Sequence, residues 1–330
     1  MHAIRIQTVL TYSAAIVVGF ALLVWGADRF VVGAAATARN LGVAPLIIGL
    51  TVVGFGTSAP EMLISAIAAW QGSPALAIGN ALGSNITNVA LILGATALIV
   101  PLGVHSDTLR REFPVLFAVM LMCLALLADG WLGRLDGVVL VGGLVLLLYA
   151  VTALALRSRK DPLAAEFAAE IPVGMGPVRA AAALLTGLVV LLVSSRLLVW
   201  GAVEVATALG VPELVIGLTI VAIGTSLPEL AASIGSALKN EHDIAIGNVL
   251  GSNMFNLMGV MGLPGIISPS AVPPAALSRD FPVMIFLTVA LFAMAYGFRA
   301  PGRITRLEGA LLLLAFAGYQ GLLYYQTATH

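Results

Sequence analysis

The chain has 330 residues, of which 60% are hydrophobic and 10% are charged, and its formal net charge at pH 7 is zero. That composition leaves too little polar surface to cover a water-soluble globule of this length, so the sequence predicts an all-α, polytopic membrane protein. The balanced charge provides no basic surface of the kind that binds nucleic acid, and we expect no nucleic-acid partner.

Ten apolar segments have about the 20 residues that a helix needs to cross a bilayer. In chain order they occupy residues 12–36, 43–69, 75–100, 113–129, 135–156, 180–207, 213–238, 244–267, 281–298 and 307–325. Five fall in each half of the chain. We therefore expect a first five-helix repeat over residues 1–160, a cytoplasmic connector over 161–177 and a second five-helix repeat over 178–330.

The two halves repeat each other in sequence. Residues 43–65 read VAPLIIGLTVVGFGTSAPEMLIS, and residues 211–233 read VPELVIGLTIVAIGTSLPELAAS. The stretch GNALGSNITNVALILG at 79–94 returns as GNVLGSNMFNLMGVMG at 247–262. Because the repeat is far longer than a solenoid unit and occurs only twice, it indicates duplication of half a protein. The functional site is then expected between the halves.

An odd number of spans per half predicts that the halves have inverted topology in the membrane. Loops on the side of both termini carry three basic residues, Arg5, Arg134 and Arg279. Loops on the other side carry eleven, which are Arg39, Arg110, Arg111, Arg157, Arg159, Lys160, Arg179, Lys239, Arg299, Arg303 and Arg306. Since cytoplasmic loops are enriched in Lys and Arg, we expect both termini on the extracytoplasmic side.

Polar residues form a cluster inside the second apolar segment. On a helix, Thr57, Ser58 and Glu61 lie within about 100° of one face. Pro60 has no N–H to bond the carbonyl of Gly56, so the helix is expected to kink there and to free backbone oxygen. The second half contains the same set, with Thr225, Ser226 and Glu229, and with Pro228 opposite the carbonyl of Gly224.

Two further stripes of polar residues recur at intervals of four. They are Asn80, Ser84 and Asn88 in the first half, and Asn248, Ser252 and Asn256 in the second. Asn80 and Asn248 fit either a role as ligands or a role in hydrogen bonding between helices. All these donor atoms are oxygens, which suit Ca²⁺ or Na⁺ rather than metals that prefer imidazole or thiolate. Two ionised glutamates are neutralised by one Ca²⁺, or balanced by two or three Na⁺.

The paired GTSxPE clusters and GNxLGSN stretches resemble the two alpha-repeats of the sodium/calcium exchanger family, within the calcium:cation antiporter superfamily, and especially its bacterial inner-membrane members. The motifs lie within residues 54–94 and 222–262, and the resemblance extends over essentially the whole chain. It implies an antiporter, not an enzyme, with ten helices in two inverted five-helix repeats and no cofactor. Such a protein would exchange three Na⁺ for one Ca²⁺ and extrude Ca²⁺, while its first and sixth helices slide across the others.

The resemblance also implies roles for individual residues. Glu61 and Glu229 would hold Ca²⁺, together with the backbone carbonyls of Thr57 and Thr225. The flanking Na⁺ sites would use Ser58, Ser226, Ser84 and Ser252, with the carbonyls of Gly54 and Ala222. Asn88 and Asn256 would take the other two central positions. Some relatives, including potassium-dependent exchangers, have Asp at one of these two positions, so Asn at both argues against a K⁺ requirement. The proline argument points instead to the carbonyls of Gly56 and Gly224, so the backbone ligands stay open.

The residues leave a second transport function open, a Ca²⁺/H⁺ antiporter in which Glu61 and Glu229 exchange two protons for one Ca²⁺. The many Ser and Thr oxygens favour Na⁺, because protons need only the carboxylates. An intramembrane hydrolase is disfavoured, since no His lies in a span near Ser58 or Ser226. A cation channel suits inverted repeats with broken helices less well than alternating access does. With a complete site in one chain, a monomer in the lipid bilayer suffices for function, with Ca²⁺ and Na⁺ as its substrates.

Overall fold

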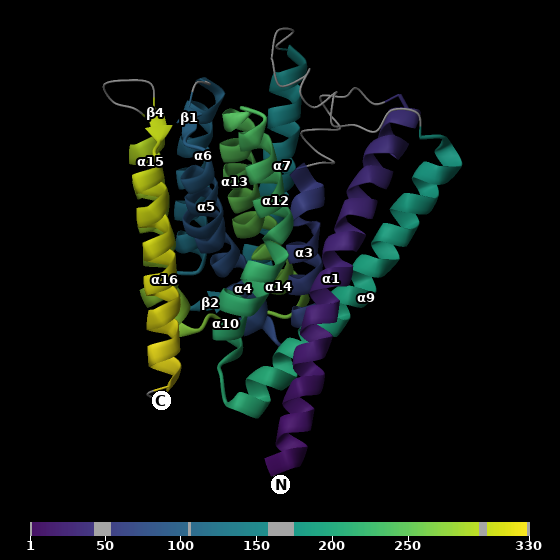
Figure 1. Ribbon diagram of the computed structural model, residues 1–330, viewed down its shortest axis with the longest axis vertical. Helices are drawn as coiled ribbons and strands as arrows, with labels where there is room; N and C mark the ends of the chain where they lie inside the picture. The colour runs from purple at the N-terminus through teal and green to yellow at the C-terminus, as the bar shows by residue number, and fades with distance from the viewer. Residues whose placement is uncertain (1, 43–53, 105–106, 158–174, 297–301, 329–330) are drawn as a thin grey trace.

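Helices form almost all of the fold (Figure 1). The computed structural model describes residues 2–42, 54–104, 107–157, 175–296 and 302–328, with the backbone alone at 2–10, 54–57, 107–111, 154–157 and 243. The first half contains α1 (His2–Asn40), α3 (Gly54–Trp70), α4 (Pro74–Ile86), α5 (Leu93–Ile99), α6 (Asp107–Leu126) and α7 (Arg134–Arg157). The second half contains α9 (Pro177–Leu209), α10 (Glu213–Ile216), α11 (Ala222–Thr225), α12 (Leu227–Leu238), α13 (His242–Phe255), α14 (Gly262–Ile267), α15 (Phe281–Tyr296) and α16 (Arg306–Ala328).

Among the described residues, seven helices are long and apolar enough to cross a bilayer, and a bent pair of helices can supply an eighth span. The seven are Thr11–Asn40, Pro74–Ile99, Arg134–Ala153, Pro177–Leu209, Ile244–Ile267, Ala276–Tyr296 and Arg306–Ala328, and the bent pair is Glu213–Thr225 with Leu227–Leu238. These match eight of the ten expected segments. Of the other two, 43–69 lies partly outside the described residues, and 113–129 corresponds to the shorter apolar helix Glu112–Leu126.

Wider π-helical turns interrupt the two most buried spans. The turn η2 (Thr87–Ile92) joins α4 to α5, and η4 (Asn256–Val260) joins α13 to α14. Two more, η3 (Gly217–Val221) and η5 (Ala276–Asp280), lie between α10 and α11 and directly before α15. Such turns disturb the regular pattern of backbone hydrogen bonds and occur often at functional sites. The first two turns coincide with the ends of the polar stripes found in the sequence.

Close backbone contacts set the position of α4 against the second half. A β-carbon at Gly79 of α4 would overlap the backbone oxygen of Leu214, and one at Gly217 of η3 would overlap that of Leu76. Glycine permits this approach because it has no side chain. The crossing holds the polar stripe of the first half against the broken helix of the second half.

The helices α1 and α9 lie side by side (Figure 1). A β-carbon at Gly33 of α1 would overlap the backbone of Leu184, and one at Gly187 of α9 would overlap the backbone of Phe30. Two glycines, one on each helix, therefore allow the two backbones to pack in direct contact. Because their backbones are in direct contact, α1 and α9 form one packed helix pair.

Two short antiparallel sheets connect the halves. Strand β1 (Leu102–Val104) pairs with β4 (Gly302–Ile304), and β2 (Trp131–Leu132) pairs with β3 (Ser270–Ala271). In each sheet one strand comes from each half. Figure 1 shows β1 and β4 at one end of the molecule, whereas β2 lies toward the other end, where both chain termini lie. The halves are therefore joined by backbone hydrogen bonds near both ends of the helices.

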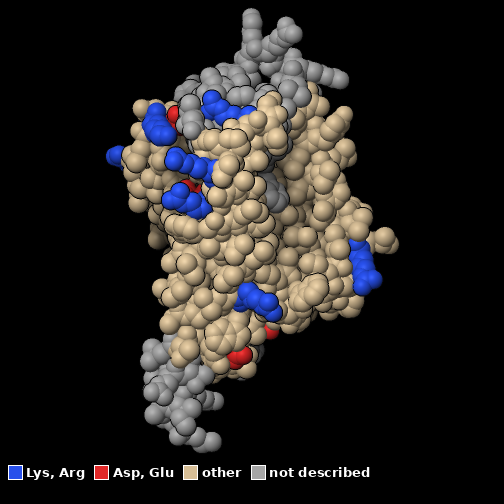
Figure 2. All heavy atoms as spheres, turned by 90° about the vertical axis from the view of Figure 1, so that its right-hand side faces the viewer, with Lys and Arg blue, Asp and Glu red and all other residues tan. Residues whose placement is uncertain are grey.

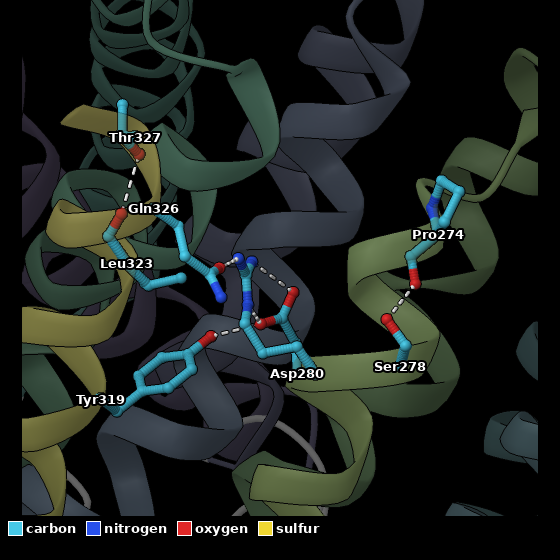
Figure 3. Close-up of polar contacts among 8 residues, drawn as sticks. Pro274, Ser278, Asp280, Tyr319, Leu323, Gln326 and Thr327 are labelled. Atoms are coloured by element: carbon cyan, nitrogen blue, oxygen red, sulfur yellow. Dashed lines mark hydrogen bonds and ion pairs between the residues drawn. The ribbon is translucent and has the colours of Figure 1, made fainter. Parts of the chain in front are cut away.

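A buried ionic network fastens α16 to the start of α15 (Figure 3). The carboxylate of Asp280 is fully buried and accepts hydrogen bonds from Arg279 Nε at 2.6 Å and from Tyr319 Oη at 2.8 Å. Arg279 Nη1 also donates to Gln326 Oε1 at 2.6 Å. A buried carboxylate needs such partners, because an unpaired charge in this environment is strongly destabilising. Tyr319 and Gln326 thus bind α16 to a charged pair at the end of η5.

We predict that Tyr319→Phe lowers the free energy of unfolding by about 1.5–3 kcal/mol, because it removes a hydrogen bond to a charged, buried group. The matched control is Tyr324→Phe on the same helix, where the side chain is 77% exposed. The thermal midpoint of the purified protein in detergent measures the difference. Equal midpoints for the two variants would show that the Asp280 network does not stabilise the helix pair.

Candidate cation-binding site

Two glutamates from different halves lie buried and near each other. Glu61 on α3 is 1% exposed and Glu229 on α12 is 0% exposed, and the two carboxylates interact electrostatically. Like charges in such an environment are costly unless a counter-charge accompanies them. The pair is therefore suited to hold a cation.

The remaining predicted side chains that the structure describes are also buried. They are Ser58, Ser84, Asn88, Thr225, Ser226, Ser252 and Asn256. The backbone of Gly54 begins α3 and that of Ala222 begins α11, while the side chain of Thr57 lies outside the described residues. The structure thus brings the described polar residues of both repeats into the protein interior.

The two proline-containing helices differ. In the second half, α11 ends at Thr225 and α12 begins at Leu227, with a bend of 43° between the two parts of the span. In the first half, α3 continues through Pro60 without interruption from Gly54 to Trp70. The sequence predicted a kink at both prolines; in the second half the helix breaks at Ser226, two residues before Pro228, whereas α3 is continuous. Similar local sequences therefore take two backbone forms.

Hydrogen bonds cross between the halves at the site. Ser58 Oγ lies 3.5 Å from Ser252 Oγ, which donates to Glu229 Oε1, also at 3.5 Å. Asn88 Nδ2 donates to Asn253 Oδ1 at 3.1 Å. These contacts show that side chains of the two repeated motifs meet. Asn253 was not among the predicted site residues, although its place in the repeated GSN triplet was a signal.

Asn80 lies at the centre of a second group of contacts. Its Oδ1 accepts hydrogen bonds from Ser84 Oγ at 3.5 Å and from Thr225 Oγ1 at 3.4 Å. Its Nδ2 donates to the backbone oxygen of Glu61 at 3.2 Å. Of the two roles that the sequence left open for Asn80, the structure shows hydrogen bonding between helices.

Several buried oxygens of the site have no hydrogen-bond partner within the described part of the chain. They are Glu61 Oε2, Asn88 Oδ1, Ser226 Oγ and Asn256 Oδ1. Asn88 has its Nδ2 committed to Asn253, so its oxygen remains as the available acceptor. A buried polar atom without a partner costs about 1–3 kcal/mol, a cost that a bound cation removes. Four oxygens of this kind come from both halves, and oxygen is the donor type that Na⁺ and Ca²⁺ prefer.

The backbone oxygen of Ala222 has partners of its own. It accepts a hydrogen bond from the backbone N–H of Ser226 at 3.2 Å and lies 3.3 Å from Thr225 Oγ1. A carbonyl oxygen has two lone pairs, and the second is engaged only when the Thr225 hydroxyl, which has a single proton, donates to it rather than to Asn80. A cation at Ala222 would need the Thr225 hydroxyl to turn away.

Helix α1 touches the site at the residue before Thr225. The ring of Phe20 fills the space beside Gly224, so that a β-carbon at Gly224 would overlap it. Gly224 therefore lets an aromatic side chain pack directly on the broken helix. A shift of α1 would alter the packing at the backbone that precedes Thr225 and Ser226.

A family model described as sodium/calcium exchanger protein matches this chain twice, over residues 11–153 and 179–325. The chain is also similar to two bacterial proteins along almost their whole length. It is 50% identical to the putative antiporter CaxA of Alkalimonas amylolytica, over 94% of this chain and 97% of that protein. It is 42% identical to the inner membrane protein YrbG of Escherichia coli, over 95% of this chain and 97% of that protein.

Archaeal and structural relatives agree with this match. The chain is 31% identical to the sodium/calcium exchanger MaX1 of Methanosarcina acetivorans, over 94% of this chain and 97% of that protein. Its fold resembles a solved structure of the sodium-calcium exchanger NCX_Mj soaked with Na⁺ and Sr²⁺. That comparison has a TM-score of 0.63 and 30% sequence identity, over 94% of this chain and 97% of the other.

Proposed function

The chain belongs to the sodium/calcium exchanger family, and we propose that it exchanges three Na⁺ for one Ca²⁺ by alternating access. Inward flow of Na⁺ would drive Ca²⁺ out of the cytoplasm. The observation that carries the proposal is the group of unpartnered buried oxygens from both halves beside the Glu61–Glu229 pair. No cluster of three or more His, Cys, Asp and Glu occurs among the described residues. The site therefore relies on two carboxylates and on neutral oxygens.

In this proposal Ca²⁺ is held by the carboxylates of Glu61 and Glu229 and by the backbone oxygens of Thr57 and Thr225. The Na⁺ sites that flank it use hydroxyl and carbonyl oxygens, with the amides of Asn88 and Asn256 at the centre. These Na⁺ ligands are Ser58, Ser84, Ser226 and Ser252, together with Gly54 and Ala222. Three Na⁺ against one Ca²⁺ moves one net charge per cycle, worth about 2.3 kcal/mol per 100 mV of membrane potential. No cofactor is needed, and one chain holds the full set.

We further propose that ten spans form two inverted repeats, over residues 1–160 and 178–330, with a connector at 161–177. The family model matches each half separately, which supports the duplication. The inversion is supported by the strands β1 and β3, which hold equivalent places in the repeat. Strand β1 pairs with β4 and strand β3 pairs with β2, and Figure 1 shows β4 and β2 toward opposite ends. Two repeats with opposite orientations in the membrane would place equivalent strands at opposite ends of the protein.

The same ends suggest the orientation in the inner membrane. On the face drawn in Figure 2, Lys and Arg gather toward the upper end, and most of the remaining surface is uncharged. That end carries β1 and β4 in Figure 1, away from both termini. Because basic residues are retained on the cytoplasmic side, this arrangement supports extracytoplasmic termini.

Alternating access requires a part of the protein that moves relative to the site. We assign this part to α1 and α9, which pack on each other through Gly33 and Gly187. Phe20 gives the pair a direct contact with Gly224 at the broken helix. Sliding of α1 and α9 would therefore change both access to the pocket and the packing at its wall.

We predict that proteoliposomes loaded with Na⁺ take up ⁴⁵Ca²⁺ when the membrane potential is clamped. Vesicles that carry only an outward proton gradient are the control and should show no uptake above background, because the hydroxyl and amide oxygens serve Na⁺ and not protons. Uptake driven by protons alone would contradict Na⁺ coupling and make the protein a Ca²⁺/H⁺ antiporter. Absence of uptake under both gradients would contradict Ca²⁺ transport altogether.

We also predict that Glu61→Gln and Glu229→Gln each reduce Na⁺-driven Ca²⁺ uptake at least about 100-fold, because each removes one of the two charges that balance Ca²⁺. Glu241→Gln at the N-cap of α13 is the matched control, since Glu241 lies outside the proposed site and outside α1 and α9. Thermal midpoints should show that all three variants are folded. Normal uptake by either pocket variant would exclude that glutamate from the Ca²⁺ site.

A further inference from the structure

We propose that Asn80 is a positioning residue, which contacts no ion itself and holds the oxygens of both halves in the arrangement that binds them. The inference rests on the proposed function and adds a residue to it. It starts from the fact that Asn80 is fully buried on α4, at the crossing between α4 and the second half.

The amide of Asn80 has its hydrogen-bonding capacity filled. Nδ2 donates to the backbone oxygen of Glu61 at 3.2 Å and to Ser65 Oγ at 3.1 Å. Oδ1 accepts from Ser84 Oγ at 3.5 Å and from Thr225 Oγ1 at 3.4 Å. An amide has two protons to donate and two lone pairs to accept with; both protons are used, and the oxygen faces two hydroxyl groups. The amide oxygen of Asn80 is therefore directed at hydroxyls of both halves.

These contacts determine how the hydroxyl groups around Asn80 are oriented. Because Nδ2 is committed to Glu61 and Ser65, the amide cannot flip, and Oδ1 must face Ser84 and Thr225. An amide oxygen only accepts, and so does the carbonyl of Ala222, which lies 3.3 Å from the Thr225 hydroxyl. Each hydroxyl has a single proton; Ser84 donates its proton to Asn80, and Thr225 can donate to Asn80 or to Ala222. When the Thr225 proton goes to Asn80, the carbonyl of Ala222 keeps a lone pair for a cation.

The groups that Asn80 contacts belong to both halves of the protein. Ser84 and the backbone of Glu61 belong to the first half, whereas Thr225 belongs to the second. One side chain therefore sets the distance between ligands that come from different repeats. Its loss would loosen the pocket without removing any proposed ligand.

The equivalent residue in the second half does not make these contacts. Asn248 Nδ2 is buried and has no hydrogen-bond partner among the described residues. The surroundings are otherwise alike, because Ser65 Oγ donates to the oxygen of Ala77 at 3.5 Å and Ser233 Oγ donates to that of Ala245 at 3.5 Å. The two asparagines thus occupy the same sequence motif and differ in their role. Asn248 is therefore a matched control.

The test compares Asn80→Ala and Asn248→Ala with the unmodified protein in Na⁺-driven ⁴⁵Ca²⁺ uptake by proteoliposomes. The half-saturating Ca²⁺ concentration and the maximal rate per folded protein are measured separately. We expect Asn80→Ala to raise half-saturation about tenfold, with a smaller change in maximal rate, since one or two hydrogen bonds that order the ligands are lost. Asn248→Ala should change half-saturation less than about twofold. A merely structural role would lower the amount of folded protein and leave half-saturation unchanged.

Thr225→Val provides a second route, because it removes the hydroxyl that meets Asn80 and keeps the backbone oxygen. It should raise half-saturation in the same direction, and combining it with Asn80→Ala should add less than the sum of the single effects. If Asn80→Ala does not fold, the half-saturating Ca²⁺ concentration of Thr225→Val tests the proposal instead.

Three outcomes would overturn the proposal. These are unchanged half-saturation in Asn80→Ala or Thr225→Val, equal shifts in the two asparagine variants, and additive effects in the double variant. An unmodified protein without Na⁺-driven uptake would instead overturn the proposed function, and the positioning role with it.

Discussion

Two carboxylates buried next to each other inside a membrane protein place the strongest constraint on this structure. Glu61 and Glu229 cannot both remain charged there without a counter-charge. The surrounding buried oxygens that lack hydrogen-bond partners need a group that interacts with their lone pairs. A bound cation would meet both requirements at once. In the proposed mechanism the pocket depends on bound ions, so that one ion leaves only when another replaces it.

The packing of the helices determines where the residues of this pocket lie. Gly79 and Gly217 let α4 cross the second half at backbone contact, which brings Asn80 and Ser84 to Thr225. The two short sheets and the Asp280 network tie other helices of the bundle together at their ends. The helices α1 and α9 instead pack on each other, and α1 reaches the site through Phe20. The arrangement separates a frame of connected helices around the candidate site from a helix pair that touches it.

Much of this was predictable from the sequence, and the rest depended on contacts that no local pattern contains. Composition and segment length predicted the all-α membrane class and the positions of eight spans. The repeat led us to expect a site between the halves, where Ser58 and Ser252 now lie 3.5 Å apart. The repeat also implied equal halves, yet α3 continues through Pro60 while the second half breaks before Pro228. Likewise, identical GNxLGSN motifs could not reveal that Asn80 has four partners and that Asn248 Nδ2 has none among the described residues. Such differences arise from how the helices cross, which the motif itself does not specify.

The central claim is that Na⁺ and Ca²⁺ compete for one pocket between the halves. Equilibrium binding of ⁴⁵Ca²⁺ to the purified protein, measured while Na⁺ is raised at constant ionic strength with K⁺, tests it most directly. The account predicts that Na⁺ displaces all bound Ca²⁺, with a dependence on Na⁺ concentration steeper than that of a single ion, and that K⁺ does not replace Na⁺ in this role. Ca²⁺ that stays bound at saturating Na⁺ would contradict a shared pocket.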